Sequence, residues 1–245
     1  MKMNENVLYK KIMRIVIFME GYMRTQVVAL FKAILLVGWF LLASTLVGIG
    51  IQSFIGDANQ YENVLMQHQF AISLGSQLLC LIGVVLMTPD QPVIKKGSEF
   101  TSLKSIFRYM MMGLGAWLIC ILITQILIPF FPDYEEINQF FVNNEDMLRF
   151  CVLVIMAPLL EEYLFRGKIQ SYLKIGFPVK FAVLIQAILF ASLHALPLQK
   201  IYSFIMGMLF GVVREKEKNF LSTFVMHMLI NSIGWYIGSF AIGIG

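Results

Sequence analysis

Residues 150–168 read FCVLVIMAPLLEEYLFRGK, and this stretch decides how the whole chain is interpreted. It begins as an apolar run of the kind that crosses a membrane. Two adjacent carboxylates, Glu161 and Glu162, and then Arg166 follow directly. Charged side chains are costly within a bilayer, and where they occur they face the protein interior or a water-filled cavity. The stretch therefore predicts a membrane-embedded helix that carries a polar site.

The rest of the chain has the composition of a multi-spanning membrane protein. Of its 245 residues, 58% are hydrophobic and 14% are charged, whereas a soluble domain has about 45–50% apolar and about 25% charged residues. Because a span needs about 20 apolar residues, the sequence predicts an all-α, polytopic transmembrane helix bundle that forms one integral membrane domain over 1–245. We expect about seven spans, or eight if the N-terminal segment inserts. The spans are 27–53, 70–88, 108–131, 148–174, 178–196, 200–213 and 220–242.

Lysine and arginine alternate between the expected loops. They occur in residues 1–26, which we interpret as a basic amphipathic lead-in on the membrane surface, and again in 95–104. They are absent from the loops 54–69 and 132–147. Since cytoplasmic loops are enriched in these residues, we predict a multi-pass plasma-membrane protein with a cytosolic N-terminus. The sequence has no basic stripe with interleaved aromatic residues, so nucleic acid is not an expected partner.

The charged stretch is predicted to lie inside the bundle rather than in a loop. The nearest turn is IGFPVK (175–180), where Gly176 ends one helix and Pro178 starts the next. Glu161 lies 15 residues before Gly176, and His194 lies 16 residues after Pro178. At a rise of about 1.5 Å per residue, both lie roughly 20–25 Å from the turn. Glu161 and His194 are therefore expected at a similar depth on two antiparallel helices.

Within this stretch one carboxylate is expected to be paired and the other free. Glu162 and Arg166 are four residues apart, which permits a salt bridge on one helix face. Glu161 points about 100° away around the helix. Taken alone, the pair could equally be a structural ion pair. The GMLFG segment, with Gly207 and Gly211, predicts close helix packing.

Two further polar pairs, in FASLH (190–194) and HMLIN (227–231), have helical i,i+4 spacing. Taken alone, His194 suits an interfacial position, and His227 with Asn231 suits hydrogen bonding between helices. Together with Glu161 they suffice for hydrolysis. A carboxylate and an imidazole can deprotonate a water, while a second imidazole and an amide can stabilise an oxyanion.

In this order, EEYLFR, FASLH and HMLIN resemble the EExxxR, FxxxH and HxxxN motifs of the CPBP family of intramembrane proteases. That family includes Rce-type CAAX prenyl endoproteases and Abi-type bacteriocin-processing or immunity proteins. The resemblance covers about residues 148–235, which we take as the catalytic core, and implies a membrane-embedded endopeptidase. The implied catalytic residues are Glu161, His194, His227 and Asn231, with Glu162, Arg166 and Phe190 in support.

The resemblance also implies roles. Glu161 would activate a water with the help of His194, and His227 and Asn231 would form the oxyanion site. We expect no cofactor, because Asn is a poor zinc ligand. The alternative is zinc held by Glu161, His194 and His227.

The expected substrate is a short peptide precursor or a membrane-associated protein tail, and the oligomeric state is left open. Two other functions remain. One is a non-catalytic bacteriocin-immunity or signalling scaffold. The other is a proton-coupled transporter that uses Glu161 and His194 as a relay. The transporter predicts two related halves, and the sequence shows no repeat.

Overall fold

The computed structural model describes residues 5–89, 102–131 and 147–242, and these residues form helices without any strand. The predicted all-α class is confirmed. Within the described ranges, three stretches are long and apolar enough to cross a membrane: Val16–Ile55, Asn59–Met87 and Leu103–Phe130. The long helices are α1 (Glu5–Ile55), α2 (Ala58–Met87), α3 (Leu103–Leu127) followed by the turn η1 (Ile128–Phe130), a composite helix over 147–176, α8 (Val179–Ser192), α9 (Pro197–Glu217) and α10 (Phe220–Ile242).

The composite helix over 147–176, which we call the site helix, contains the charged stretch. It is continuous, as expected for 148–174, and it ends at Gly176 before the predicted turn. Pro178, with φ of −54°, lies at the start of α8. Two segments of the site helix are π-helical, a feature often found at functional sites. In order, the segments are α5 (Met147–Phe150), the π-helical η2 (Cys151–Met156), α6 (Ala157–Glu161), the π-helical η3 (Glu162–Ile169) and α7 (Gln170–Gly176).

The α1–α2 connection corrects one expectation. Residues 54–69 were predicted as a loop, but the turn is confined to Gly56 and Asp57, and α2 begins at Ala58. The Asp57 side chain accepts a hydrogen bond from the Gln60 N–H at 2.9 Å, which is the arrangement of a helix N-cap. The helix then continues to a kink at His68, where φ is −117°. The polar residues after Asp57 begin a helix rather than a loop because the Asp57 side chain caps its first turn.

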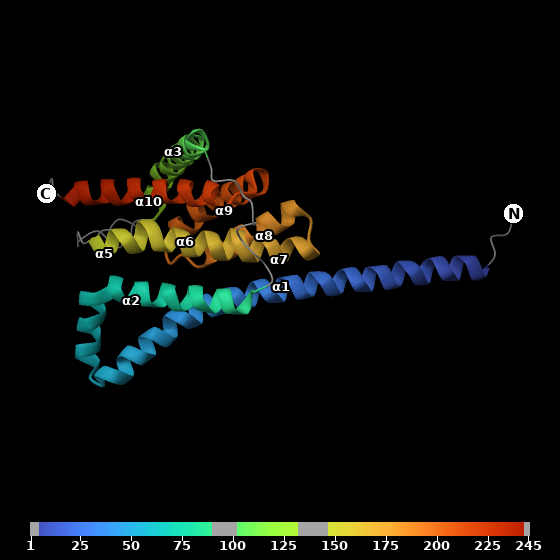
Figure 1. Ribbon diagram of the computed structural model, residues 1–245, viewed down its shortest axis with the longest axis horizontal. Helices are drawn as coiled ribbons and strands as arrows, with labels where there is room; N and C mark the ends of the chain where they lie inside the picture. Colours follow the sequence, from blue (N-terminus) through green and yellow to red (C-terminus); the bar gives the residue numbers. More distant parts are fainter. Residues whose placement is uncertain (1–4, 90–101, 132–146, 243–245) are drawn as a thin grey trace.

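α1 runs without interruption through the expected lead-in. Its 51 residues correspond to about 76 Å at 1.5 Å per residue, more than twice the roughly 30 Å of bilayer hydrocarbon. The N-terminal part of α1 extends beyond the other helices (Figure 1). The described part of the lead-in is therefore continuous with the first expected span.

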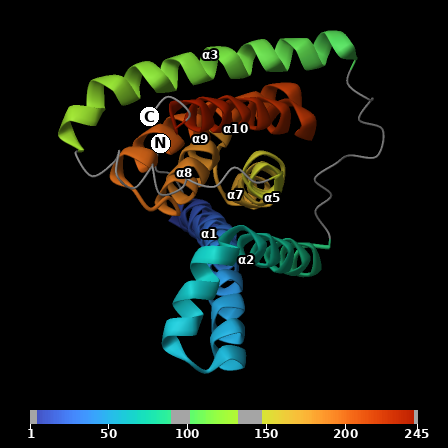
Figure 2. The same cartoon turned by 90° about the vertical axis from the view of Figure 1, so that its left-hand side faces the viewer.

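The site helix lies between two groups of helices. The α1–α2 hairpin lies on one side of it, while α10 and α3, which lies across α10, are on the other (Figures 1 and 2). One hydrophobic cluster joins α1, α2, the site helix and α8, and includes Phe190. The second joins α3, α9 and α10, and includes Phe210. The polar site must therefore lie where these two clusters approach each other.

The packing expected for GMLFG is confirmed. A Cβ atom added to Gly207 would lie 2.9 Å from the Ala187 Cα of α8, closer than real Cβ atoms approach. The Gly207 carbonyl accepts a hydrogen bond from Gln186 Nε2 at 2.7 Å, and the Gly211 carbonyl accepts one from Gln170 Nε2 at 3.1 Å. Small residues thus let α9 approach closely enough for buried amides to bond to its backbone.

Candidate active site

Four polar side chains of the site helix and α10 form a contiguous cluster. Glu162 Oε1 lies 3.0 Å from Arg166 NH1, so the expected ion pair is present, and both side chains are 0% exposed. His227 Nδ1 donates to the same Glu162 oxygen at 3.0 Å. The opposite ring atom, His227 Nε2, lies 3.6 Å from Glu161 Oε2. His227 therefore lies between the two adjacent carboxylates.

The two carboxylates differ in environment. The Glu161 side chain is 22% exposed, whereas that of Glu162 is fully buried. Glu162 is engaged by Arg166 and His227, and the contact of Glu161 with His227 is longer than a hydrogen bond. This division matches the expectation that one carboxylate pairs with Arg166 and the other does not.

Aromatic rings from both hydrophobic clusters enclose the charged pair. The Arg166 guanidinium carbon lies 4.3 Å from the centre of the Phe190 ring and 5.3 Å from that of Phe210. The His227 ring packs against the same two rings, with centres 6.3 Å and 5.4 Å away. Rings in these positions stabilise a desolvated cation. The two rings also hold Arg166 of the site helix beside His227 of α10.

His194 lies in the turn after α8, whose last residue is Ser192. Its Nδ1 lies 3.1 Å from the Phe190 carbonyl oxygen, and its ring packs edge-on against the Phe190 ring at 5.0 Å. Phe165 of the site helix packs against Phe190 at 5.1 Å. Because the helices are antiparallel, Glu161, one turn before Phe165, is level with His194, one turn after Phe190. The structure does not place His194 in contact with Glu161; the imidazole that contacts Glu161 belongs to His227.

Asn231 is anchored by a feature of the site helix that originates in Pro158. In the π-helical segment, the Ala157 N–H bonds to the Val152 carbonyl, five residues earlier. The Leu153 carbonyl would then need the N–H of residue 158, which proline lacks. Asn231 Nδ2 donates to the Leu153 oxygen at 2.8 Å. A proline and a π turn thus create the acceptor that fixes the Asn231 amide.

The alternative zinc site does not assemble among the described residues. Of its three expected ligands, Glu161 and His227 approach each other, but His194 bonds to the Phe190 carbonyl. In the parts of the chain that the structure describes, no three His, Cys, Asp or Glu side chains gather closely enough to hold a metal ion. These residues as arranged do not fit a zinc ion, and no chemical step is derived through one.

Two residues of the site were not found by sequence reasoning. Phe210 completes the aromatic enclosure, and its position before Gly211 on the packed face of α9 was the available signal. Leu153 contributes through its backbone oxygen. The only sequence signal for that oxygen is Pro158, five residues later.

Comparison with known proteins finds a family that resembles this part of the chain. Residues 143–233 match the family described as type II CAAX prenyl endopeptidase Rce1-like. No curated protein and no solved structure matches the chain. The matched range contains the site helix, α8, α9 and all three motifs. Because the Rce1-like family is a family of proteases, the match supports an enzyme that acts on a peptide or protein in a membrane setting. The Rce-type resemblance inferred from the motifs is therefore confirmed over residues 143–233, which are similar to the Rce1-like family.

Proposed function

We propose that this protein is an intramembrane endopeptidase that hydrolyses a peptide bond in a short peptide precursor or a membrane-associated protein tail. The observation that carries the proposal is the 3.6 Å approach of Glu161 Oε2 to His227 Nε2. It joins a partly exposed carboxylate of the site helix to an imidazole of α10 that Glu162 holds in place. A base that activates water and a donor for the oxyanion must act on one reacting carbon, and the approach of Glu161 to His227 supports these two roles.

Glu161 is the general base in the proposed reaction. Its carboxylate takes a proton from water, and the water oxygen bonds to the carbonyl carbon of the substrate. The carbonyl electron pair moves to oxygen and gives a tetrahedral oxyanion. When the carbon–nitrogen bond breaks, the leaving amine takes the proton from Glu161. One water is consumed, and a carboxyl group and an amine are formed.

His227 and Asn231 hold the oxyanion in this proposal. They are four residues apart on α10 and lie on one face of the helix. The bond from His227 Nδ1 to Glu162 leaves Nε2 to donate when the ring is protonated. Asn231 Nδ2 has two hydrogens, and the Leu153 carbonyl accepts one. Donors fixed in advance by other bonds stabilise a developing charge most effectively.

His194 orients the water in this proposal. Its Nδ1 donates to the Phe190 carbonyl, so in the neutral ring Nε2 is an acceptor. The helix register supports this role because it sets His194 level with Glu161. We expect His194→Ala to lower the turnover rate by about 10²–10⁴, the usual contribution of a group that assists proton transfer.

The test compares cellular peptides and membrane proteins in wild type and in Glu161→Gln by mass spectrometry. We expect one or more uncut precursors to accumulate and their products to disappear, with unchanged amounts of the protein. Glu62→Gln on the exposed surface of α2 is the matched control and should leave the products unchanged. An unaltered peptide profile in Glu161→Gln, at normal abundance, would refute the protease and favour a scaffold.

The proposed reaction needs no metal. A strong chelator should leave the activity of the purified protein unchanged, and metal analysis should find less than one zinc per chain. Loss of activity with the chelator and recovery on return of zinc would overturn this mechanism while leaving the protease assignment intact.

We also propose a plasma-membrane location with the N-terminus and residues 95–104 in the cytosol and 132–147 outside. The alternation of Lys and Arg between these segments supports this orientation. A cysteine placed at Asn138 should react with an impermeant reagent in intact cells. Reaction only after permeabilisation would reverse the orientation.

A further inference from the structure

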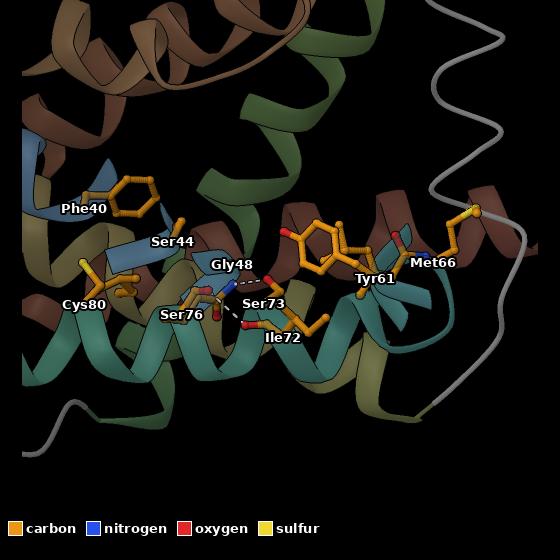
Figure 3. Close-up of a pocket in the computed structure, with 13 residues that line it drawn as sticks. Phe40, Ser44, Gly48, Tyr61, Met66, Ile72, Ser73, Ser76 and Cys80 are labelled. Atoms are coloured by element: carbon orange, nitrogen blue, oxygen red, sulfur yellow. Dashed lines mark hydrogen bonds between the residues drawn. The ribbon is translucent and has the colours of Figure 1, made fainter. Parts of the chain in front are cut away.

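Two hollows lie beside α1, and their linings differ in charge. The larger, of about 540 Å³, lies between α1 and α2, and none of its lining side chains is charged (Figure 3). The smaller, of about 230 Å³, lies between α1 and α7. Arg24 and Lys32 of α1 line this smaller hollow, and no carboxylate does. We call it the basic pocket.

The two cations of the basic pocket have no acidic partner among the described residues. Neither Arg24 nor Lys32 takes part in any ion pair found in the described ranges. Lys32 Nζ instead lies 4.8 Å from the centre of the Tyr172 ring, which holds an ammonium without neutralising it. The nearest acidic residue along α1 is Glu20, which does not line the pocket. The pocket therefore suits an anion.

The sequence of α1 sets the depth of the basic pocket. Residues 33–51 contain no charged side chain, and 19 residues correspond to about 28 Å of helix, close to the thickness of the bilayer hydrocarbon. Lys32 therefore lies at one boundary of the hydrocarbon, and Arg24 lies two turns farther out. Tyr172, on the other wall, is of a residue type enriched at this boundary. The pocket thus lies at the level of the lipid headgroups, where phosphate groups are concentrated.

The remaining walls of the basic pocket favour an occupant with an apolar part. Val28 and Ile175 line it and are 46% and 60% exposed. Beyond Lys32, the exposed side chains of Phe31 and Leu35 continue the same face of α1 toward the bilayer. A free phosphate ion gains nothing from such walls, whereas a phospholipid has a phosphate and acyl chains at the same spacing from the boundary.

The size and charge of the basic pocket narrow the class of lipid. A volume of about 230 Å³ is below the roughly 300–1,000 Å³ of pockets for drug-sized molecules, so it suits a headgroup and not a whole lipid. A zwitterionic headgroup brings a cation of its own, which Arg24 and Lys32 would repel. An anionic headgroup brings none. Arginine also has the planar donor geometry that matches a phosphate.

We propose that the basic pocket binds an anionic phospholipid, with Arg24 and Lys32 on its phosphate and its acyl chains along the α1 face that contains Phe31 and Leu35. This site is independent of the proposed endopeptidase function. The lipid contacts α1 and α7 together, where the helices are already close: a Cβ atom added to Gly176 would lie 2.7 Å from the Gln26 Cα. Bound lipid therefore holds α1 against the C-terminal end of the site helix.

Photo-crosslinking of the full-length protein in vesicles of equal phosphatidylglycerol and phosphatidylcholine tests the location. A photoreactive amino acid replaces Val28 in the pocket or, as control, Val27, which is 66% exposed at nearly the same depth but does not line it. We expect the ratio of phosphatidylglycerol to phosphatidylcholine adducts to be at least fivefold higher at position 28 than at 27. Equal ratios at the two positions would overturn the proposal.

Lipid titration of the detergent-purified protein, followed by native mass spectrometry, tests the two cations. Phosphatidylglycerol should bind at least tenfold more tightly than phosphatidylcholine. Arg24→Gln and Lys32→Gln should each weaken its binding by about fivefold, as for the loss of one basic residue beside anionic lipid. The control Lys104→Gln removes an exposed cation of α3, on the other side of the site helix, and should change nothing (Figure 2).

Two results of this titration would contradict the proposal. Unchanged phosphatidylglycerol binding in the double variant Arg24→Gln/Lys32→Gln would remove the lipid from the basic pocket. Displacement of the lipid by inorganic phosphate at equal concentration would show a site for a free anion and overturn the assignment to a phospholipid.

Discussion

The site helix with α8–α10 and the α1–α2 hairpin are both helical and apolar, but they bury different groups. Residues 147–242 bury charged and amide side chains, whereas in the described part of 5–89 the buried polar side chains are Ser76 and Thr88. The hairpin instead exposes large apolar residues along both helices. The buried polar residues of 147–242 are Arg149, Glu162, Arg166, Lys168, Gln170, Gln186, Ser203, Ser222, Thr223 and His227.

The two regions therefore depend on different interactions. Buried charges require particular partners at particular distances, so the C-terminal region should tolerate few substitutions. Apolar contacts with lipid are non-directional, so the outer face of the hairpin should tolerate many. A buried hydrogen bond also joins the regions: Lys168 Nζ donates to the Thr88 carbonyl at 2.9 Å, at the C-terminal end of α2, where a cation is favourable.

The largest expected effect comes from breaking the buried pair. Glu162→Ala and Arg166→Ala should each cost about 3–5 kcal/mol, because each leaves an unpaired charge without water. Both abundance in membranes and thermal stability should fall. The double variant Glu162→Met/Arg166→Leu should restore stability, because it removes both charges. It should not restore activity, since His227 loses its acceptor. Single variants as stable as wild type would show that the Glu162–Arg166 pair does not stabilise the C-terminal helices.

Loss of the Asn231 amide should mainly affect the rate. Asn231→Ala should lower turnover by about 10²–10³, as for loss of one oxyanion donor. It should also destabilise the fold by about 1–3 kcal/mol, because the Leu153 carbonyl loses its partner. Ser232→Ala is the control, since its hydroxyl bonds only within α10, to the Met228 carbonyl. Equal rates for the two variants would remove Asn231 from the oxyanion site.

A matched pair of glycine variants tests whether the C-terminal helices are packed more tightly than the α1–α2 hairpin. The Cβ atom of Gly211→Ala would come within 2.8 Å of Gln186 Nε2, and such overpacking costs about 1–3 kcal/mol. Gly38→Ala in α1 meets no atom within 4 Å and should be neutral or stabilising by up to about 1 kcal/mol. Melting temperatures in the same detergent decide the matter. A similar response at both sites would contradict the proposed difference in tolerance.

The smallest effect is expected for an ion pair at the surface. Lys174 lies 2.8 Å from Glu215 Oε1, but its side chain is 35% exposed. Lys174→Met should therefore cost less than about 1 kcal/mol. A loss of stability as large as that of Arg166→Ala would show that burial does not explain the difference in stability between the two ion pairs.

The helices were predictable wherever one local signal decided them. Gly176 and Pro178 marked the turn, and α10 occupies the expected 220–242. The prediction of a loop over 54–69 was wrong because it relied on the polar composition of the segment, whereas Asp57 caps a helix that begins at Ala58. The two π-helical segments have no clear signal in composition. In Cys151–Met156, the Leu153 oxygen lacks the N–H that Pro158 cannot supply, and it is paired by a donor from α10, Asn231 Nδ2, which only the folded chain brings near.

For the candidate site, the spacing of residues along one helix predicted a contact, but contacts between different helices could not be predicted. The i,i+4 spacing of Glu162 and Arg166 correctly predicted their pair. The position of His227 between both carboxylates joins residues 65 apart in sequence, and no periodicity encodes it. The functional roles of Glu161, His194, His227 and Asn231 stay predictions for the experiments above.

The π-helical segments also determine how the chain would respond to a change in length. In a π turn each N–H bonds five residues back instead of four, so the segment accommodates one additional residue. Deleting one residue from Cys151–Met156 would let the backbone return to α-helical register. Because the π turn holds the additional residue, the side chains on both sides of the deletion would keep their faces relative to Glu161. In α1, which is α-helical over Glu5–Ile55, a one-residue deletion after Leu36 would rotate the preceding side chains by about 100° relative to the rest of the helix and turn Ala33 and Leu36 out of the hydrophobic core.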